Sequence, residues 1–166
     1  MSAKMKNFLV ACLFFALIGL NVYVFVSPYL PKRSGLVLYF LPNIYREESL
    51  NRFVSSLQSD LHTKIDVQYS DITDAEKYQN LVLELIQNPS SAPDIVMVYD
   101  KDDLIMSSNE RLKKLLPYLE PIGGAYTVKR PNPGIPVGFA LTIWCEDKDK
   151  ALKIIDKLVD NYFSLR

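Results

Sequence analysis

The nine residues APDIVMVYD, at positions 92–100, decide the fold of this chain. Pro93 and Asp94 lead into the apolar run Ile95–Tyr99, and acidic residues follow at positions 100, 102 and 103. A short apolar run bounded by turn residues is typical of a strand buried on both faces of a sheet. The acidic residues are either the solvated end of that strand or part of a ligand site.

Outward from this strand, apolar runs alternate with helical patterns. Leu36–Leu41 and Val137–Cys145 are further apolar runs, and Ile65–Tyr69 alternates like a more exposed strand. Apolar residues three and four positions apart predict helices over residues 46–62, 75–87, 107–119 and 149–162. Residues 122–136, rich in Gly and Pro, predict a loop.

This order of elements predicts an α/β fold. Strands that alternate with helices form a mainly parallel sheet with helices on both faces, which makes three layers. In such sheets, ligands bind outside the carboxyl ends of the strands. We therefore expect a ligand near residues 42–45, 70–74 and 99–103.

The N-terminal part of the chain differs from the rest, because residues 7–31 carry no charge. These 25 residues are long enough to cross a hydrocarbon core of about 30 Å as a helix. We expect residues 1–33 to be a membrane anchor and linker, and residues 34–166 to be one domain. A cleaved signal peptide is an alternative, although no Ala-x-Ala pattern closes the apolar run. A lipid-anchored Cys12 is another, although its Leu-Val-Ala-Cys box opens that run.

Basic residues flank the apolar run equally, with Lys4 and Lys6 before it and Lys32 and Arg33 after it. Charge therefore does not set the orientation of the span. The short N-terminus and the long following domain favour an N-terminus inside the cell. We expect a single-pass protein of the cell membrane whose C-terminal domain lies on the extracytoplasmic side.

The charge of the domain excludes some partners. Residues 34–166 hold 19 acidic and 15 basic residues, which gives a net charge near −4. A negative domain argues against a nucleic-acid partner and against a basic membrane-surface patch. The two cysteines do not suggest a disulfide framework, and Cys145 is expected to be a small buried apolar residue.

No catalytic signature stands out in the sequence. His62 is the only histidine, and neither a nucleophile–base pair nor a phosphate-binding glycine loop is visible. Asp100 and Asp102 have the first spacing of a calcium loop, but the glycine that should follow is missing. We expect a protein that is not an enzyme and that binds no metal or cofactor.

Aromatic and polar residues near the predicted strand ends are the candidate ligand contacts. Aromatic faces stack on sugar rings and other flat apolar surfaces. The competing interpretation of each aromatic candidate is a position in the core or at its rim. The candidate residues are Asn43, Tyr45, Asp71, Tyr99, Asp100 and Trp144.

The run AEKYQNLVLELIQNPSSAPDIVMVYD, residues 75–100, resembles the extracellular solute-binding proteins of ABC importers, the group that includes maltose-type sugar binders. Tyr78 stands at the tyrosine of the family's helix, and Ala92–Val96 matches its A-P-D-[VI]-[VI] element. The resemblance covers about residues 36–166. It implies that the strand at 137–145 returns antiparallel beside the third strand, with strand order 2-1-3-4.

The chain departs from that family in one respect, because residues 122–136 stand where the family has a whole second lobe. The family clamps its ligand between two lobes, so one lobe offers half a site. The resemblance implies a membrane-anchored, one-lobed binding module for a small, sugar-like solute or for a transport partner such as an ABC permease. The alternative is a structural or accessory subunit of a membrane complex that binds no ligand.

Overall fold

The computed structural model describes residues 35–99, 110–122, 128–132 and 135–166. The expected membrane span at 7–31 and the acidic residues at 100, 102 and 103 lie outside these ranges. Within them, no helix is long and apolar enough to span a membrane.

The domain is an α/β fold built on a five-stranded mixed sheet with the order β2-β1-β3-β5-β4. The strands are β1 (Leu36–Phe40), β2 (Ile65–Tyr69), β3 (Ile95–Tyr99), β4 (Val128–Lys129) and β5 (Val137–Leu141). β1 pairs parallel with β2 and β3, whereas β5 pairs antiparallel with β3 and β4. The α/β class is therefore confirmed, and the sheet is mixed rather than mainly parallel.

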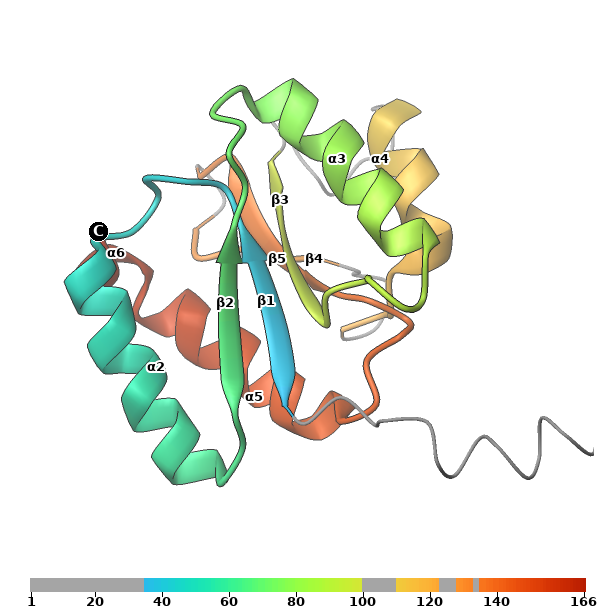
Figure 1. Ribbon diagram of the computed structural model, residues 1–166. Coiled ribbons are helices and arrows are strands. Elements are labelled where there is room, and N and C mark those ends of the chain that lie inside the picture. Colours follow the sequence, from blue (N-terminus) through green and yellow to red (C-terminus); the bar gives the residue numbers. More distant parts are fainter. Residues whose placement is uncertain (1–34, 100–109, 123–127, 133–134) are drawn as a thin grey trace, which may run out of the picture. The chain divides into compact units, whose positions relative to one another are not determined.

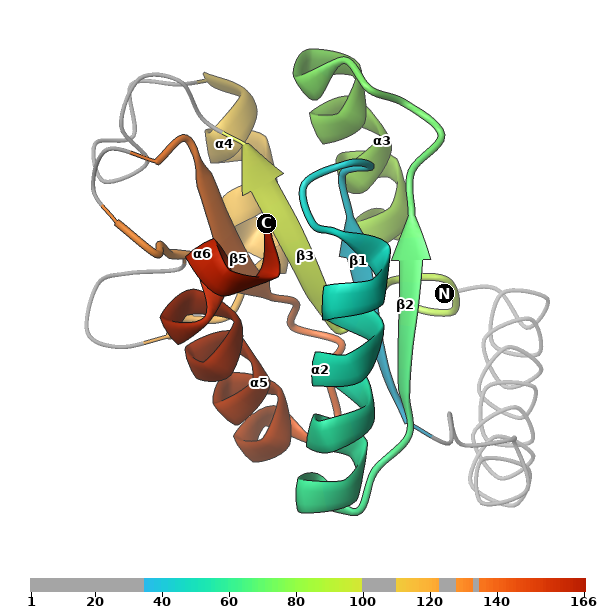
Figure 2. The same ribbon diagram turned by 90° about the vertical axis from the view of Figure 1, so that its left-hand side faces the viewer.

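Helices cover both faces of this sheet. They are α2 (Glu47–Leu61), α3 (Ala75–Gln87), α4 (Glu110–Leu115), α5 (Lys148–Asp160) and α6 (Tyr162–Leu165), with a 3₁₀ turn at Leu116–Tyr118. Figures 1 and 2 show α2, α5 and α6 on one face and α3 and α4 on the other. The three layers expected from the alternation of strands and helices are present.

Aspartates begin two of the helices. The side chain of Asp74 accepts a hydrogen bond from the Lys77 N–H at 2.9 Å and caps α3. Asp147 caps α5 in the same way through the Lys150 N–H at 3.3 Å. Each carboxylate satisfies a backbone donor that has no partner within its helix.

The core lies around the three central strands, and Tyr78 of α3 shows how it is tied together. Its side chain is 0% exposed, and its ring stacks on Tyr39 of β1 with centroids 5.9 Å apart. Its hydroxyl lies 3.1 Å from the Tyr39 carbonyl oxygen and 3.0 Å from that of Met97 in β3. The tyrosine on which the family resemblance rests is thus a core residue that joins α3 to two strands.

Two elements differ from the sequence-based expectation. Residues 128–129, expected within a loop, form β4, and Val128 pairs with Ala140. Gly138 permits this approach, because a Cβ there would collide with the Val128 side chain. A strand of two residues is too short to show an alternating pattern. The last helix, expected to run to Tyr162, breaks after Asp160 into α5 and α6.

Candidate functional site

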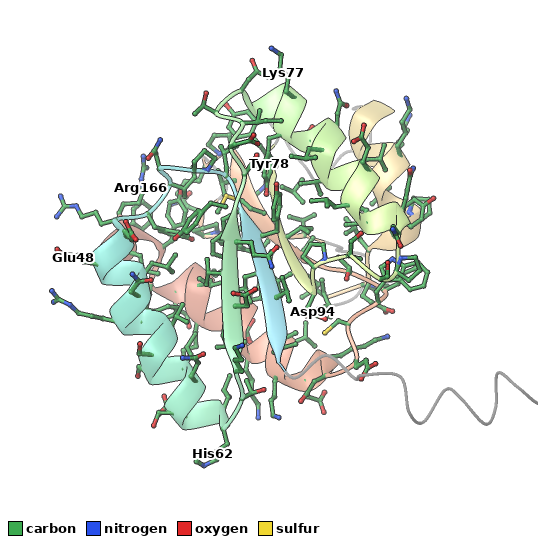
Figure 3. The ribbon with its side chains drawn as sticks, in the orientation of Figure 1. Glu48, His62, Lys77, Tyr78, Asp94 and Arg166 are labelled. Carbon is green, nitrogen blue, oxygen red and sulfur yellow. The ribbon has the colours of Figure 1, made fainter. Side chains whose placement is uncertain are left out.

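The sheet has two edges of different character. The parallel strands β1, β2 and β3 all end at one of them, which we call the carboxyl edge. β5 runs the other way and ends beside the start of β3, where Leu141 pairs with Ile95. We call that end of the sheet the amino edge. In Figure 3, Lys77 and Arg166 lie toward the carboxyl edge, whereas Asp94 and His62 lie toward the opposite end.

Three of the candidate residues lie at the carboxyl edge. Asn43 is exposed in the loop after β1 and has the left-handed backbone angle φ of 61°. Asp71 is exposed in the loop after β2, and Tyr99 is partly exposed at the end of β3. The loop after β2 is held in place by Ser70, whose N–H donates to the Phe40 oxygen at 3.0 Å. The structure therefore brings Asn43, Asp71 and Tyr99 to one edge, and Asp100 lies outside the described residues.

Tyr45 also follows β1, but it lies in the core. Its ring contacts Phe40 edge-on at 5.8 Å and Tyr162 at 5.7 Å, and the residue is 8% exposed. Its hydroxyl is buried and has no hydrogen-bond partner among the described residues. Burial, and then the neighbouring Tyr162 and Tyr69, raise the pKa of Tyr45 far above that of a free tyrosine. The Tyr45 ring presents no open face on which a ligand could stack.

Two aromatic residues that sequence reasoning did not select are exposed near the carboxyl edge. Phe163 in α6 is 65% exposed, and Tyr69 at the end of β2 is 41% exposed. Phe163 is held edge-on against Tyr162 at 5.5 Å, and the Arg166 guanidinium lies 5.8 Å from the Tyr162 ring centroid. The Arg46 N–H donates to the Leu165 oxygen at 2.9 Å, which fixes α6 beside the start of α2.

The sequence contains a signal that the Phe163 side chain is exposed. Successive helical residues point about 100° apart, so a large apolar residue directly after the inward Tyr162 faces elsewhere. Tyr69 carries a similar signal, because it ends the more exposed of the predicted strands. Burial, and then the negative charge of Glu47 in the first turn of α2, raise the pKa of Tyr69.

Trp144 lies at the amino edge, away from the other candidates. Its indole N–H donates to the Ile86 oxygen near the end of α3 at 2.7 Å, and the residue is 36% exposed. The separation follows from the direction of β5, since an antiparallel strand carries the residues after it to the opposite end of the sheet. Trp144 cannot share a site with Tyr99.

Asp94 has a structural role that sequence reasoning missed. Its carboxylate accepts a hydrogen bond from the Val37 N–H at 2.7 Å, and its own N–H donates to the Val37 oxygen at 2.8 Å. Its carbonyl oxygen accepts from the Thr142 N–H at 2.9 Å, and the Thr142 hydroxyl donates to the Pro93 oxygen at 2.7 Å. Asp94 thus joins the start of β3 to β1 and to the residues after β5.

Cys145 is part of the same network. It is a free cysteine that is 3% exposed, as expected for a small buried residue. Burial, followed by the negative charge of Asp94, raises the pKa of the Cys145 thiol to about 12. A buried thiol that keeps its proton is a poor nucleophile.

Within the described ranges, no three or more His, Cys, Asp and Glu residues gather in a way that could hold a metal ion. No protein-family model matches the chain, and no curated protein is similar to it in sequence.

Proposed function

We propose that this chain is a membrane-anchored binding module that docks through its carboxyl edge onto a membrane partner of a solute-transport system. The observation that carries the proposal is the exposed Phe163, held against Tyr162 next to the ends of the parallel strands. Large aromatic side chains anchor protein interfaces because they bury much apolar area and lose little conformational entropy.

The place of action is part of the same proposal. The uncharged run at 7–31 supports a membrane anchor, and the resemblance to solute-binding proteins supports a domain outside the cytoplasm. The module is proposed to be a binding protein rather than an enzyme, and a single lobe suits a flat partner better than an enclosed solute.

Photo-crosslinking in native membranes tests this proposal. A photoreactive amino acid replaces Phe163 in the full chain, and a second variant carries it at His62, toward the amino edge of the sheet. We expect position 163 to yield an adduct with a membrane-embedded transporter subunit, identified by mass spectrometry, and position 62 to yield none. Equal labelling from both positions, or an adduct with a protein outside any transport system, contradicts the proposal.

A sugar-like small solute is the second candidate, because Asn43, Asp71 and Tyr99 converge at the carboxyl edge. The melting temperature of the full chain in detergent can be measured against a panel of sugars and osmolytes. Binding raises it by mass action, and Tyr99→Ala removes the rise whereas Trp144→Phe keeps it. If no solute shifts the melting temperature, this candidate is wrong.

An accessory or structural subunit that binds no ligand remains the other alternative. The buried ring of Tyr45 favours it, because this burial removes one aromatic face from the edge where a ligand would stack. Such a subunit would give the same crosslink at position 163 whether or not the transported solute is present. A transport module would instead change its crosslinking yield when solute is added.

A further inference from the structure

β2 is the outermost strand on one side of the sheet, and its long side, as distinct from the carboxyl and amino edges, is open to a further strand. It stands at the end of the strand order, and among the described residues it pairs with β1 alone. Figure 1 looks onto this edge, and no described helix or strand lies in front of β2. A strand edge with unpaired N–H and C=O groups is a template for another strand. β2 contains no Pro or Lys, which commonly blunt such edges, and Asp66 is its only charged residue.

The hydrogen bonds on either side of β2 show which groups face outward. The Lys64 oxygen accepts from the Leu36 N–H at 2.8 Å, and the Ser70 N–H donates to the Phe40 oxygen at 3.0 Å. Even-numbered residues therefore point their backbone groups toward β1, and the odd-numbered residues between them point away. In agreement with this, the Ile65 N–H is accepted by the side chain of Gln58 at 2.8 Å. The N–H groups of Val67 and Tyr69 face the open edge, and pairing at Ile65 requires the Gln58 side chain to release the Ile65 N–H.

We propose that a second copy of this chain adds its own β2 to this edge, antiparallel and centred on Val67. The two sheets then continue into one across a twofold axis. In this register Asp66 lies opposite Gln68 of the second copy, and the amide can donate to the carboxylate. The same two groups already form a hydrogen bond of 2.8 Å within one chain. Centring on Asp66 instead would place two carboxylates opposite each other, which is destabilising.

The exposure of Tyr69 fits this pairing. In the proposed register its ring lies across from Ile65 of the second copy, and pairs of aromatic and β-branched residues stabilise neighbouring strands. The 41% exposed surface of Tyr69 would be covered in the dimer. The inference is independent of the proposed docking partner, since it concerns the strand edge and not Phe163.

Disulfide trapping in membranes tests the register. Two full-length chains carrying Cys12→Ser are co-expressed, one with Asp66→Cys and one with Gln68→Cys. Both positions are exposed, so the fold should tolerate the changes. In the proposed dimer, position 66 of one copy and position 68 of the other form a pair without backbone hydrogen bonds. Their Cα atoms would lie about 4.5 Å apart, a separation that suits a disulfide. We expect the mixed disulfide to form several-fold faster than either same-site disulfide. Equal rates, or no disulfide, overturn the proposal.

A charge exchange provides an independent check on the full chain in detergent, with the dimer fraction measured by light scattering. Gln68→Glu places like charges opposite each other twice and should weaken the dimer about threefold to tenfold. Adding Asp66→Lys restores opposite charges and should restore the dimer. A dimer that neither change affects is held together elsewhere, and the proposal fails.

Discussion

The two edges of the sheet differ in how their polar groups are satisfied. At the amino edge, the Asp94 carboxylate, the Thr142 hydroxyl and the Trp144 indole N–H each have a hydrogen-bond partner. At the carboxyl edge, the Tyr45 hydroxyl is buried with no partner in the part of the chain that the structure describes, and Phe163 leaves most of its surface in water.

A buried hydroxyl without a partner costs about 1–3 kcal/mol, and an exposed phenylalanine contributes little to the core. Features that weaken a fold at one place and not at another tend to mark the place where function lies. The amino edge therefore holds the domain together, and the carboxyl edge is its candidate working surface.

Removal of the Asp94 carboxylate should have the largest effect. In Asp94→Ala, the Val37 N–H loses its acceptor at 2.7 Å and the tie between β1 and β3 is broken. We expect the free energy of unfolding to fall by about 3 kcal/mol. Trp144 is the only tryptophan, so its fluorescence during urea unfolding of the full chain in detergent reports the loss.

Asp94→Asn is the matched control. Its amide oxygen can still accept from Val37, so this variant should lose about 1 kcal/mol. If both variants unfold at the wild-type urea concentration, Asp94 does not tie the amino edge together.

Alkaline pH should weaken the amino edge through Cys145. Its thiol has a pKa of about 12 in the folded chain, compared with an ordinary value of 9.0. Below pH 9 the thiol is protonated in both states, and its full contribution to stability is present. Between about pH 9 and 12 the unfolded chain releases this proton first, so the free energy of unfolding falls.

Urea unfolding at pH 8 and pH 11, in chains that carry Cys12→Ser, measures this effect. The version with Cys145 should lose more stability than the version with Cys145→Ala. An equal loss in both would mean that the Cys145 thiol ionises as easily in the folded chain as in the unfolded one.

Two exposed aromatic residues, one at each edge, allow a smaller comparison. Trp144→Phe removes the bond to the Ile86 oxygen and should cost about 1 kcal/mol. Phe163→Ala should change the free energy of unfolding by less than about 0.5 kcal/mol, because this side chain is mostly in water. Circular dichroism during urea unfolding compares the two. A larger loss from Phe163→Ala would make α6 part of the stabilising core and not a docking surface.

Much of the fold could be predicted from the sequence because its strands are unusually apolar. The runs at 36–41, 95–99 and 137–145 match β1, β3 and β5 to within a few residues. The order of four strands that the family resemblance implies, rather than the apolar pattern, reappears within the five. β4 could not be predicted, since its pairing depends on the missing side chain of Gly138, a contact distant in sequence.

The candidate site was harder to predict, because exposure is set by distant parts of the chain. Tyr45 follows the end of a predicted strand, where an aromatic ring can contact a ligand. In the structure, Tyr162 of α6, more than 100 residues later in the chain, packs against the Tyr45 ring. Asp94 marks the start of the third strand in the sequence, yet no pattern in the sequence shows that its carboxylate reaches Val37. Such contacts depend on how the strands pair, and not on spacing along the chain.

Removal of one hydroxyl at each edge tests the central comparison most directly. Thr142→Val removes the bond to the Pro93 oxygen, and Tyr45→Phe removes a buried hydroxyl that no described residue contacts by a hydrogen bond. Urea unfolding of the full chain should show Thr142→Val less stable by about 1–2 kcal/mol and Tyr45→Phe unchanged or more stable by up to about 1 kcal/mol. If Tyr45→Phe loses as much stability as Thr142→Val, the Tyr45 hydroxyl is as well satisfied as the Thr142 hydroxyl, and the two edges do not differ in this way.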